Sequence, residues 1–299
     1  MKLRAYLPYV YLAAPLAMLA CFFFAPFVWA CWISLLDYNQ DLYNPRFVGL
    51  ANYNRLLHTP AFWQALQNTF VFLLGVVPAM VTLPIALAVL LNGQLRGISL
   101  FRALIYLPVV ISMVVVGLTW KWLLDSNGLV NYLLSLVGIA KVNWLVNPDV
   151  ALFALMIVSI WKGMAYYMMM YLAHLQNAEK ELYEAAEIDG ASTWQKHWHV
   201  TLPHLRPTMV MVAIISTIGS LKVFVEIYVM TRGGPVGATK TLVYYIYERA
   251  FERLDLGIAS AAGIVLMIIL IVLSLIQLKF SGEESSTTPK PTRNLKAGV

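Results

Sequence analysis

Long apolar stretches constrain this chain more than any other feature of its sequence. Of its 299 residues, 60% are hydrophobic and 12% are charged, which is about half the charged fraction of an average soluble domain. A soluble fold of this length cannot bury so much apolar surface, so the surplus must face lipid. Six stretches can each cross roughly 30 Å of hydrocarbon as a helix, at 8–36, 67–91, 103–124, 150–175, 207–230 and 257–279. The sequence therefore predicts an all-α, polytopic membrane protein with six transmembrane helices.

The first apolar stretch follows two basic residues, as the core of a secretory signal peptide does. Because it is much longer than such a core, residues 1–36 are predicted to remain in place as an N-terminal transmembrane helix. Both cysteines, Cys21 and Cys31, lie in this stretch. Ten helical residues separate them by about 15 Å, which is too far for a disulfide. They are predicted to be small buried apolar groups.

The distribution of Lys and Arg predicts the orientation in the membrane. With the N-terminus inside, the cytoplasmic segments carry slightly more basic residues than the outer ones. Both termini are therefore predicted to be cytoplasmic. The tail, residues 281–299, is rich in Pro, Ser and Thr, and is predicted to be disordered. The net charge of +6 is spread singly between apolar runs, so no basic patch for nucleic acid is predicted.

Prolines interrupt several of the predicted spans. Pro78 and Pro84 lie in the second span and Pro108 lies in the third. Each proline removes a backbone donor and favours a kink. Two interpretations remain open: the prolines set only the shape of the bundle, or they serve a bundle that must change shape.

The polar segment between the fourth and fifth spans, residues 179–207, carries the strongest local signals. Residues 179–189 have the small, apolar and acidic residues of a short amphipathic helix, and Gly190 is a natural helix stop. Ser192 and Gln195 have the spacing of a capping box, so a second short helix is predicted to begin there and to end at Pro203. The residues alone leave two alternatives open, a projecting hairpin that receives a partner or an amphipathic loop on the lipid surface.

The same segment resembles a known family. The run Glu184-Ala185-Ala186, with Gly190 after three residues and then Val200-Thr201-Leu202-Pro203, is similar to the EAA loop of binding-protein-dependent ABC importer permeases. The resemblance implies a type I ABC importer permease core over 66–278, with residues 1–36 as an additional helix. It also implies that 179–207 is a cytoplasmic coupling loop, which docks into a groove on an ATPase. The coupling residues implied by position are Glu184, Ala185, Ala186, Gly190, Leu202 and Pro203.

A second resemblance narrows the family. The segment LKVFVEIYVMTRGGP, residues 221–235, and the later runs TLVYYIYERAF and GIASAAG resemble the F-subunit type of the maltose-type carbohydrate-uptake permeases. The maltose F-subunit has extra spans and a large outer domain, whereas the outer loops here are short. The chain is therefore similar to the smaller sugar or glycerol-3-phosphate permeases of the bacterial inner membrane.

This resemblance implies a function and a set of partners. The function would be ATP-driven, binding-protein-dependent import of a sugar, oligosaccharide or polyol by alternating access. The partners would be a second, related permease subunit that completes a heterodimer, two cytoplasmic ABC ATPase subunits and an extracytoplasmic substrate-binding protein. The alternatives are a glycerol-3-phosphate importer and, in another class, an ATP-independent secondary transporter.

The sequence contains no motif for chemistry of its own. A Walker A loop requires Lys directly after Gly, and no Lys in this chain follows a Gly. ATP and Mg²⁺ are therefore expected on the partner ATPases, with no cofactor and no catalytic residue in this chain. His197, His199 and His204 cluster in the coupling loop, but their spacing does not bring them together as zinc ligands, so no metal site is predicted.

Charged residues within the spans are candidates for a substrate pathway, because a charge in the membrane is costly unless it faces the protein interior or a wet cavity. Lys222 and Glu226 are spaced to share one helix face and to pair, and this pair is open to a structural or a functional interpretation. A phosphate site would require unpaired cations, so the pairing favours a neutral solute. The predicted pathway residues are Lys162, Tyr166, Ser216, Gly219, Lys222 and Glu226.

Overall fold

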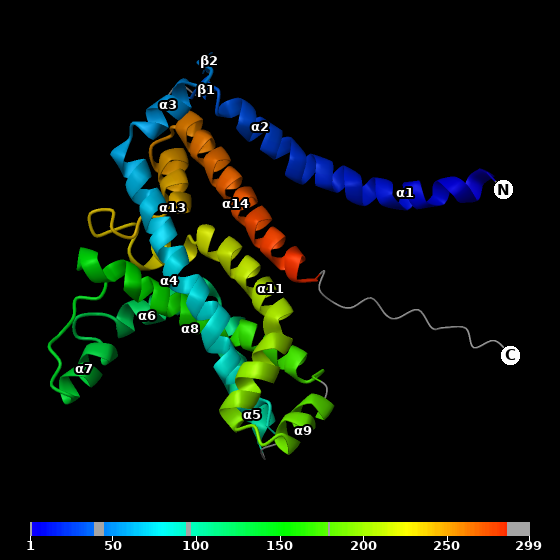
Figure 1. Ribbon diagram of the computed structural model, residues 1–299. Helices are drawn as coiled ribbons and strands as arrows, with labels where there is room; N and C mark the ends of the chain where they lie inside the picture. The colour runs from blue at the N-terminus through cyan, green and yellow to red at the C-terminus, as the bar shows by residue number, and fades with distance from the viewer. Residues whose placement is uncertain (1, 39–44, 94–96, 179, 286–299) are drawn as a thin grey trace.

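The computed structural model describes residues 2–38, 45–93, 97–178 and 180–285. Long helices form a splayed bundle from which the N-terminal helix projects (Figure 1). Within the described residues the only strands are β1 (Leu36–Asp37) and β2 (Arg46–Phe47), an antiparallel pair in which Leu36 faces Phe47. The predicted all-α membrane fold is confirmed.

The N-terminal helix runs without interruption through α1 (Lys2–Leu19), the π-helical turn η1 (Ala20–Phe24) and α2 (Ala25–Ile33). It packs on the rest of the chain where α2 meets α14 (Leu256–Ser285). No side chain from 11 to 33 is buried within the chain. The prediction that the cysteines are buried is wrong, because Cys21 is exposed and Cys31 only half-buried on a helix that leaves the bundle.

The main core lies between three long helices, α4 (Pro60–Leu91), α8 (Pro148–Leu175) and α11 (Leu202–Leu221). Phe72, Met168 and Tyr171 fill it, and the Tyr171 hydroxyl donates to the carbonyl of Val81 at 3.0 Å. A buried hydroxyl needs such a partner in an apolar bundle. The core thus holds the three helices that surround the pocket described below.

A second core joins α14 to the short helices at the end of the bundle that carries the strand pair. These helices are α3 (Ala51–Leu57) and α13 (Leu242–Tyr247). The π-helical η3 (Glu248–Glu252) follows α13 and also contacts α14. Ala261 and Ala262 on α14 are fully buried. Their small side chains allow close helix packing in a membrane.

The third predicted span is broken. Helices α5 (Ile98–Val110) and α6 (Met113–Leu123) meet at an angle of 97°. Pro108 was predicted to favour a kink in this span, and the structure has a full break just after it, because Ile111 and Ser112 have extended ψ angles of 136° and 139°. In the described part of the chain, five helices are long and apolar enough to cross a membrane, or up to six if this bent pair counts as one span.

The fifth predicted span is also interrupted, and it begins earlier than predicted. Helix α11 ends at Leu221, and α12 (Val225–Met230) follows after an irregular link. On the other side, α10 (Thr193–Lys196) continues through the π-helical η2 (His197–Thr201) into α11 without a break. Pro203 therefore does not end a short helix as predicted. The wide π-turn before it, closed by the Leu202 N–H on the His197 carbonyl, accommodates the missing proline donor.

Two further helices complete the described chain. Helix α7 (Leu129–Leu136) lies between α6 and α8, and α9 (Lys180–Ile188) lies between α8 and α10. Helix α14 continues to Ser285, beyond residue 281 at which the tail was predicted to begin. The remainder of the predicted tail lies outside the described residues.

Candidate functional site

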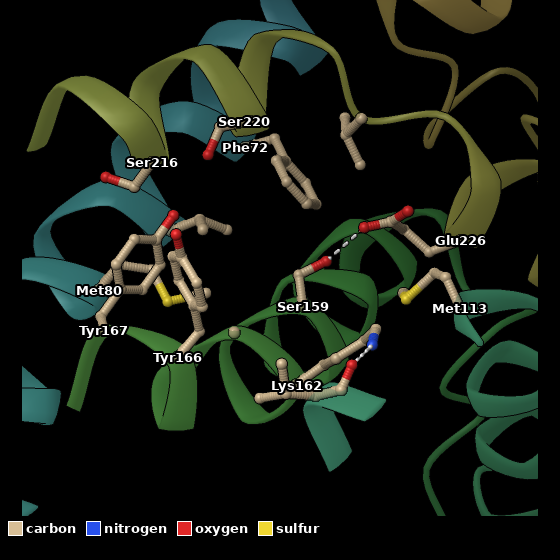
Figure 2. A pocket seen from close by; sticks show the side chains of 15 residues that line it. Phe72, Met80, Met113, Ser159, Lys162, Tyr166, Tyr167, Ser216, Ser220 and Glu226 are labelled. Atoms are coloured by element: carbon tan, nitrogen blue, oxygen red, sulfur yellow. Dashed lines mark hydrogen bonds between the residues drawn. The ribbon is translucent and has the colours of Figure 1, made fainter. Parts of the chain in front are cut away.

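A pocket of about 300 Å³ lies among α4, α8, α11 and the α12 segment (Figure 2). Five of the six predicted pathway residues line it, namely Lys162, Tyr166, Ser216, Gly219 and Glu226. Side chains that sequence reasoning did not select complete the wall, among them Phe72, Met80, Ser159 and Ser220. Phe72 and Met80 come from α4, far from the predicted residues in the sequence, whereas helical spacing from Lys162 and Ser216 could have indicated Ser159 and Ser220.

Glu226 reaches the pocket because the chain breaks before it. The irregular link after Leu221 starts a new helix, α12, with Glu226 in its first turn. The Ser159 hydroxyl on α8 donates to Oε1 of Glu226 at 2.8 Å, as Figure 2 shows. The carboxylate is therefore oriented from across the pocket.

Lys222 lies elsewhere. It is exposed and lines a shallow groove against α14 with Ile218 and Leu275. The predicted ion pair of Lys222 with Glu226 is not formed. That prediction assumed one continuous helix, but α11 ends at Leu221 and Lys222 is its C-cap residue.

Lys162 donates hydrogen bonds to backbone rather than to an acid. Its Nζ atom lies 3.1 Å from the carbonyl oxygen of Pro108, 3.4 Å from that of Val109 and 2.8 Å from that of Ile111. These carbonyls lie at the broken end of α5, where a helix has no intrahelical donors left to offer. The cation thus faces the α5–α6 bend.

Aromatic and hydroxyl groups form the opposite side of the pocket. The rings of Tyr166 and Tyr167 meet edge to face with centroids 5.3 Å apart. Gly163 leaves room for Met80, whose Cε atom would lie 2.5 Å from a Cβ at that position. The pocket therefore offers ring faces, hydroxyls and one carboxylate, which can pack on and hydrogen-bond to a small polar molecule.

The polar hairpin has the predicted helix stop at Gly190 and helix restart at Ser192. Gly190 has φ +76°, and the N–H of Ala191 bonds to the carbonyl of Ala186 at 2.9 Å. Together with the 3.0 Å bond from the Gly190 N–H to the Glu187 carbonyl, this is a Schellman termination of α9. The predicted capping box between Ser192 and Gln195 is present and starts α10.

The hairpin presents an exposed apolar surface at the end of the bundle far from the strand pair (Figure 1). Ile188 is 87% exposed and Trp194 is 73% exposed, and Trp194 stacks on Trp198 with centroids 6.2 Å apart. Glu184 and Ala185 are also exposed, on the same hairpin. Exposed apolar groups of this size are typical of an interaction surface. Sequence reasoning selected the glutamate and alanines but missed the two tryptophans.

The hairpin is tied to α11, and the two remaining predicted coupling residues lie there. The Tyr183 hydroxyl lies 3.0 Å from Oγ1 of Thr201, in the π-turn that leads into α11. Leu202 and Pro203 form the first turn of α11, behind the hairpin rather than on its tip. A displacement of the hairpin would therefore be passed directly to α11.

The histidines near the hairpin take part in local contacts. The rings of His174 and His204 lie 4.6 Å apart, and Nδ1 of His174 lies 2.9 Å from the Thr208 hydroxyl. Nδ1 of His197 lies 3.2 Å from the Thr201 hydroxyl. Among the described residues, no group of three or more His, Cys, Asp or Glu is arranged to hold a metal ion.

A buried acid organises the segment that joins α12 to α14. Glu248 accepts hydrogen bonds from Arg253, with Nη2 to Oε1 at 2.6 Å, and from the Lys240 ammonium group. Burial by itself raises the pKa of Glu248, but the hydrogen bonds and the positive charges of Lys240 and Arg253 outweigh burial and lower it below the usual 4.5. Glu248 therefore holds the chain on both sides of α13 together as an ionised group.

A bundle of apolar helices encloses a pocket with hydroxyl and carboxylate groups, and a hairpin projects from a helix that reaches this pocket. This arrangement defines a multi-pass membrane permease. The chain belongs to the family of binding-protein-dependent transport system inner membrane components, whose model matches residues 5–281.

Relatives and a solved structure agree with this assignment. The chain is 36% identical over 275 residues to a lactose transport system permease protein of Rhizobium radiobacter, covering 90% of this chain and 92% of the relative. It is 34% identical over 277 residues to a trehalose/maltose transport system permease protein of Thermococcus litoralis, covering 92% and 94%. A chain of a bacterial alginate ABC transporter, solved in complex with an alginate pentasaccharide-bound periplasmic protein, matches with a TM-score of 0.83, 26% identity and coverage of 96% and 97%.

Proposed function

We propose that this chain is a permease subunit of an ATP-driven importer that takes a sugar, oligosaccharide or polyol from a binding protein. One observation carries the proposal. The helical run from Thr193 through η2 to Leu221 is continuous, and it joins the hairpin to the pocket wall at Ser216 and Ser220. A push on the hairpin therefore moves the pocket wall.

The lining of the pocket supports a hydroxyl-rich, uncharged solute. Serine hydroxyls and the Glu226 carboxylate can hydrogen-bond to hydroxyl groups, and the tyrosine rings can pack on a sugar ring. The lactose and trehalose/maltose permeases among the relatives support the same class of solute. Lys162, the cation in this pocket, donates to backbone carbonyls, which disfavours the alternative of glycerol-3-phosphate because a phosphate requires available cations.

Two exposed surfaces of this chain support the proposed partners. Two cytoplasmic ATPases, which would bind ATP and Mg²⁺, would receive the hairpin through Glu184, Ala185, Ala186 and the exposed tryptophans. A second permease subunit would cover the N-terminal helix. Beside that helix, an apolar cavity of about 590 Å³ lies between Phe23, Phe27 and α14, and it is wide enough to admit side chains of a neighbouring helix.

In this mechanism, ATP-driven closure of the ATPases pushes α9 and α10, and α11 transmits the displacement to the pocket. The pocket then opens alternately to the two sides of the membrane as the helices rock. Gly190 and the capping box keep the hairpin short and defined, so that the displacement is not lost in a flexible loop. This chain acts without catalytic residues of its own.

A panel of solutes tests the proposed substrate class. Membranes that contain the whole transporter and its binding protein would be supplied with radiolabelled lactose, maltose, trehalose, an arabino-oligosaccharide and glycerol-3-phosphate. We expect ATP-dependent uptake of at least one of the neutral saccharides and none of glycerol-3-phosphate. Uptake of glycerol-3-phosphate alone would overturn the assignment. Uptake that persists without ATP would instead favour a secondary transporter.

A further inference from the structure

The break between α5 and α6 leaves backbone carbonyls without intrahelical donors, which is costly inside a membrane. The last carbonyls of any helix lack intrahelical donors. Lipid offers none, so in a bilayer such carbonyls must find donors within the protein or face a water-filled cavity. At this break the chain turns by 97° within an apolar segment. The open carbonyls therefore need donors from elsewhere in the protein.

Lys162 supplies those donors. An ammonium group has three N–H donors and no acceptor. Nζ of Lys162 lies within 3.4 Å of three carbonyl oxygens, those of Pro108, Val109 and Ile111. Its positive charge also lies at the C-terminal end of α5, where the helix dipole is negative. All the hydrogen-bonding capacity of the group is thus directed at the break.

The bend that Lys162 contacts is also a wall of the pocket. Val109, just before the break, and Met113, just after it, both line the pocket. Figure 2 shows Lys162 and Met113 on the same side of the pocket as Glu226. Glu226 bonds instead to Ser159, and the described residues contain no ion pair between Glu226 and Lys162.

We propose that Lys162 is a positioning residue, which caps the broken end of α5 and thereby holds the α5–α6 bend in the shape that forms the pocket. The proposal rests on the proposed function only in taking this pocket to be the solute site. Lys162 does not bind the solute in this account. Its three N–H donors are directed at backbone carbonyls, so the ammonium group is not available to a solute in the pocket.

The reactivity of a cysteine placed at the bend tests the proposal. Met113→Cys would be introduced in a chain with Cys21→Ala and Cys31→Ala, and the assembled transporter in membranes would be treated with N-ethylmaleimide. We expect Lys162→Met to raise the rate of modification by roughly tenfold, the effect of losing one charge-assisted hydrogen bond or more. Lys162→Arg, which keeps the charge and the donors, should stay close to the parent rate. Lys121→Met, on the exposed last turn of α6, is the matched control and should leave the rate unchanged.

Two further measurements distinguish a positioning role of Lys162 from direct contact with the solute. If Lys162→Met does not accumulate, Lys162→Gln, which can donate without charge, should give an intermediate rate. An unchanged rate in both uncharged variants, with a raised KM for uptake, would overturn the proposal in favour of direct solute contact. The modification rate reports the bend without any solute. A changed rate together with failure of the saccharide panel would therefore refute the proposed function and leave this inference standing.

Discussion

Glu248 illustrates how single side chains stabilise the segment between α12 and α14. Its carboxylate is buried between Lys240 and Arg253. We expect Glu248→Gln to destabilise the purified protein by roughly 1–3 kcal/mol, because it leaves the half-buried Lys240 cation without its partner. Thermal unfolding in detergent at neutral pH would measure the loss.

The pH dependence of this contribution has a definite sign. The pKa of Glu248 is lower in the folded protein than its usual value of 4.5, so the stabilisation is complete above pH 4.5 and is lost as the pH falls through the folded pKa. We expect the difference in Tm between the wild type and Glu248→Gln to shrink on acidification below pH 4.5. A difference that stays constant down to pH 3 would contradict the assigned charge state.

Replacement of Glu226 can distinguish a role in transport from a role in assembly. The Glu226 carboxylate accepts a hydrogen bond from the Ser159 hydroxyl. Glu226→Gln should preserve that hydrogen bond while removing the charge. We expect the transporter to assemble normally and uptake to fall by roughly tenfold. Ser159→Ala is the companion variant and should have a smaller effect in the same direction. Reduced assembly with normal uptake per complex would identify Glu226 as a structural group instead.

The hairpin is the element on which the coupling account depends. Gly190 has φ +76°, and beyond its two chain neighbours no heavy atom lies within 4 Å of the position that a Cβ would occupy there, so a substitution acts through backbone conformation rather than through a clash. We expect Gly190→Val to cost about 1–2 kcal/mol locally and to re-aim α9 against α10. The spans should still insert, while retention of the ATPase and uptake are lost.

Gly190→Asn is the matched control, because asparagine tolerates the left-handed conformation. It should retain most of the ATPase in a pull-down from the same membranes. Full retention and wild-type uptake in Gly190→Val would show that the coupling element lies elsewhere.

Sequence patterns correctly predicted those elements that depend on the chemistry of neighbouring residues in the chain. Hydropathy placed the apolar segments, and Gly190, Ser192 and Gln195 predicted the hairpin termination and restart that the structure contains. Average hydropathy does not report where a helix breaks, so the break after Leu221 was missed and the break after Val110 was indicated only as a proline kink. Pro108, close to the first break, was the available signal.

The pocket could be predicted only in part, because local sequence patterns do not report contacts between separate helices. The energetic cost of a charge in the membrane predicted that Lys162 and Glu226 face inward, and both residues line the pocket. Their partners lie on other helices, Ser159 for Glu226 and the α5 carbonyls for Lys162. Helical spacing instead suggested Lys222 as the partner of Glu226, which required a continuous helix that does not exist.

At the scale of the whole molecule, the topology is open to a direct test. We expect both termini on the cytoplasmic side and the loop after α12 outside. In a chain without Cys21 and Cys31, a cysteine at Val236, which is 90% exposed, should react with a membrane-impermeant maleimide on intact cells. A cysteine at Ser285, at the end of α14, should react only after permeabilisation. Reaction at Ser285 in intact cells would refute the orientation.

The central claim is that this chain moves a solute only when a partner ATPase acts on its hairpin. The most direct measurement is solute uptake into proteoliposomes that contain the complete transporter, with ATP on the ATPase side and the loaded binding protein on the other. Replacing the Walker A lysine of the ATPase should abolish uptake while the complex stays intact. Uptake that continues with the inactive ATPase and depends instead on an ion gradient would contradict the account.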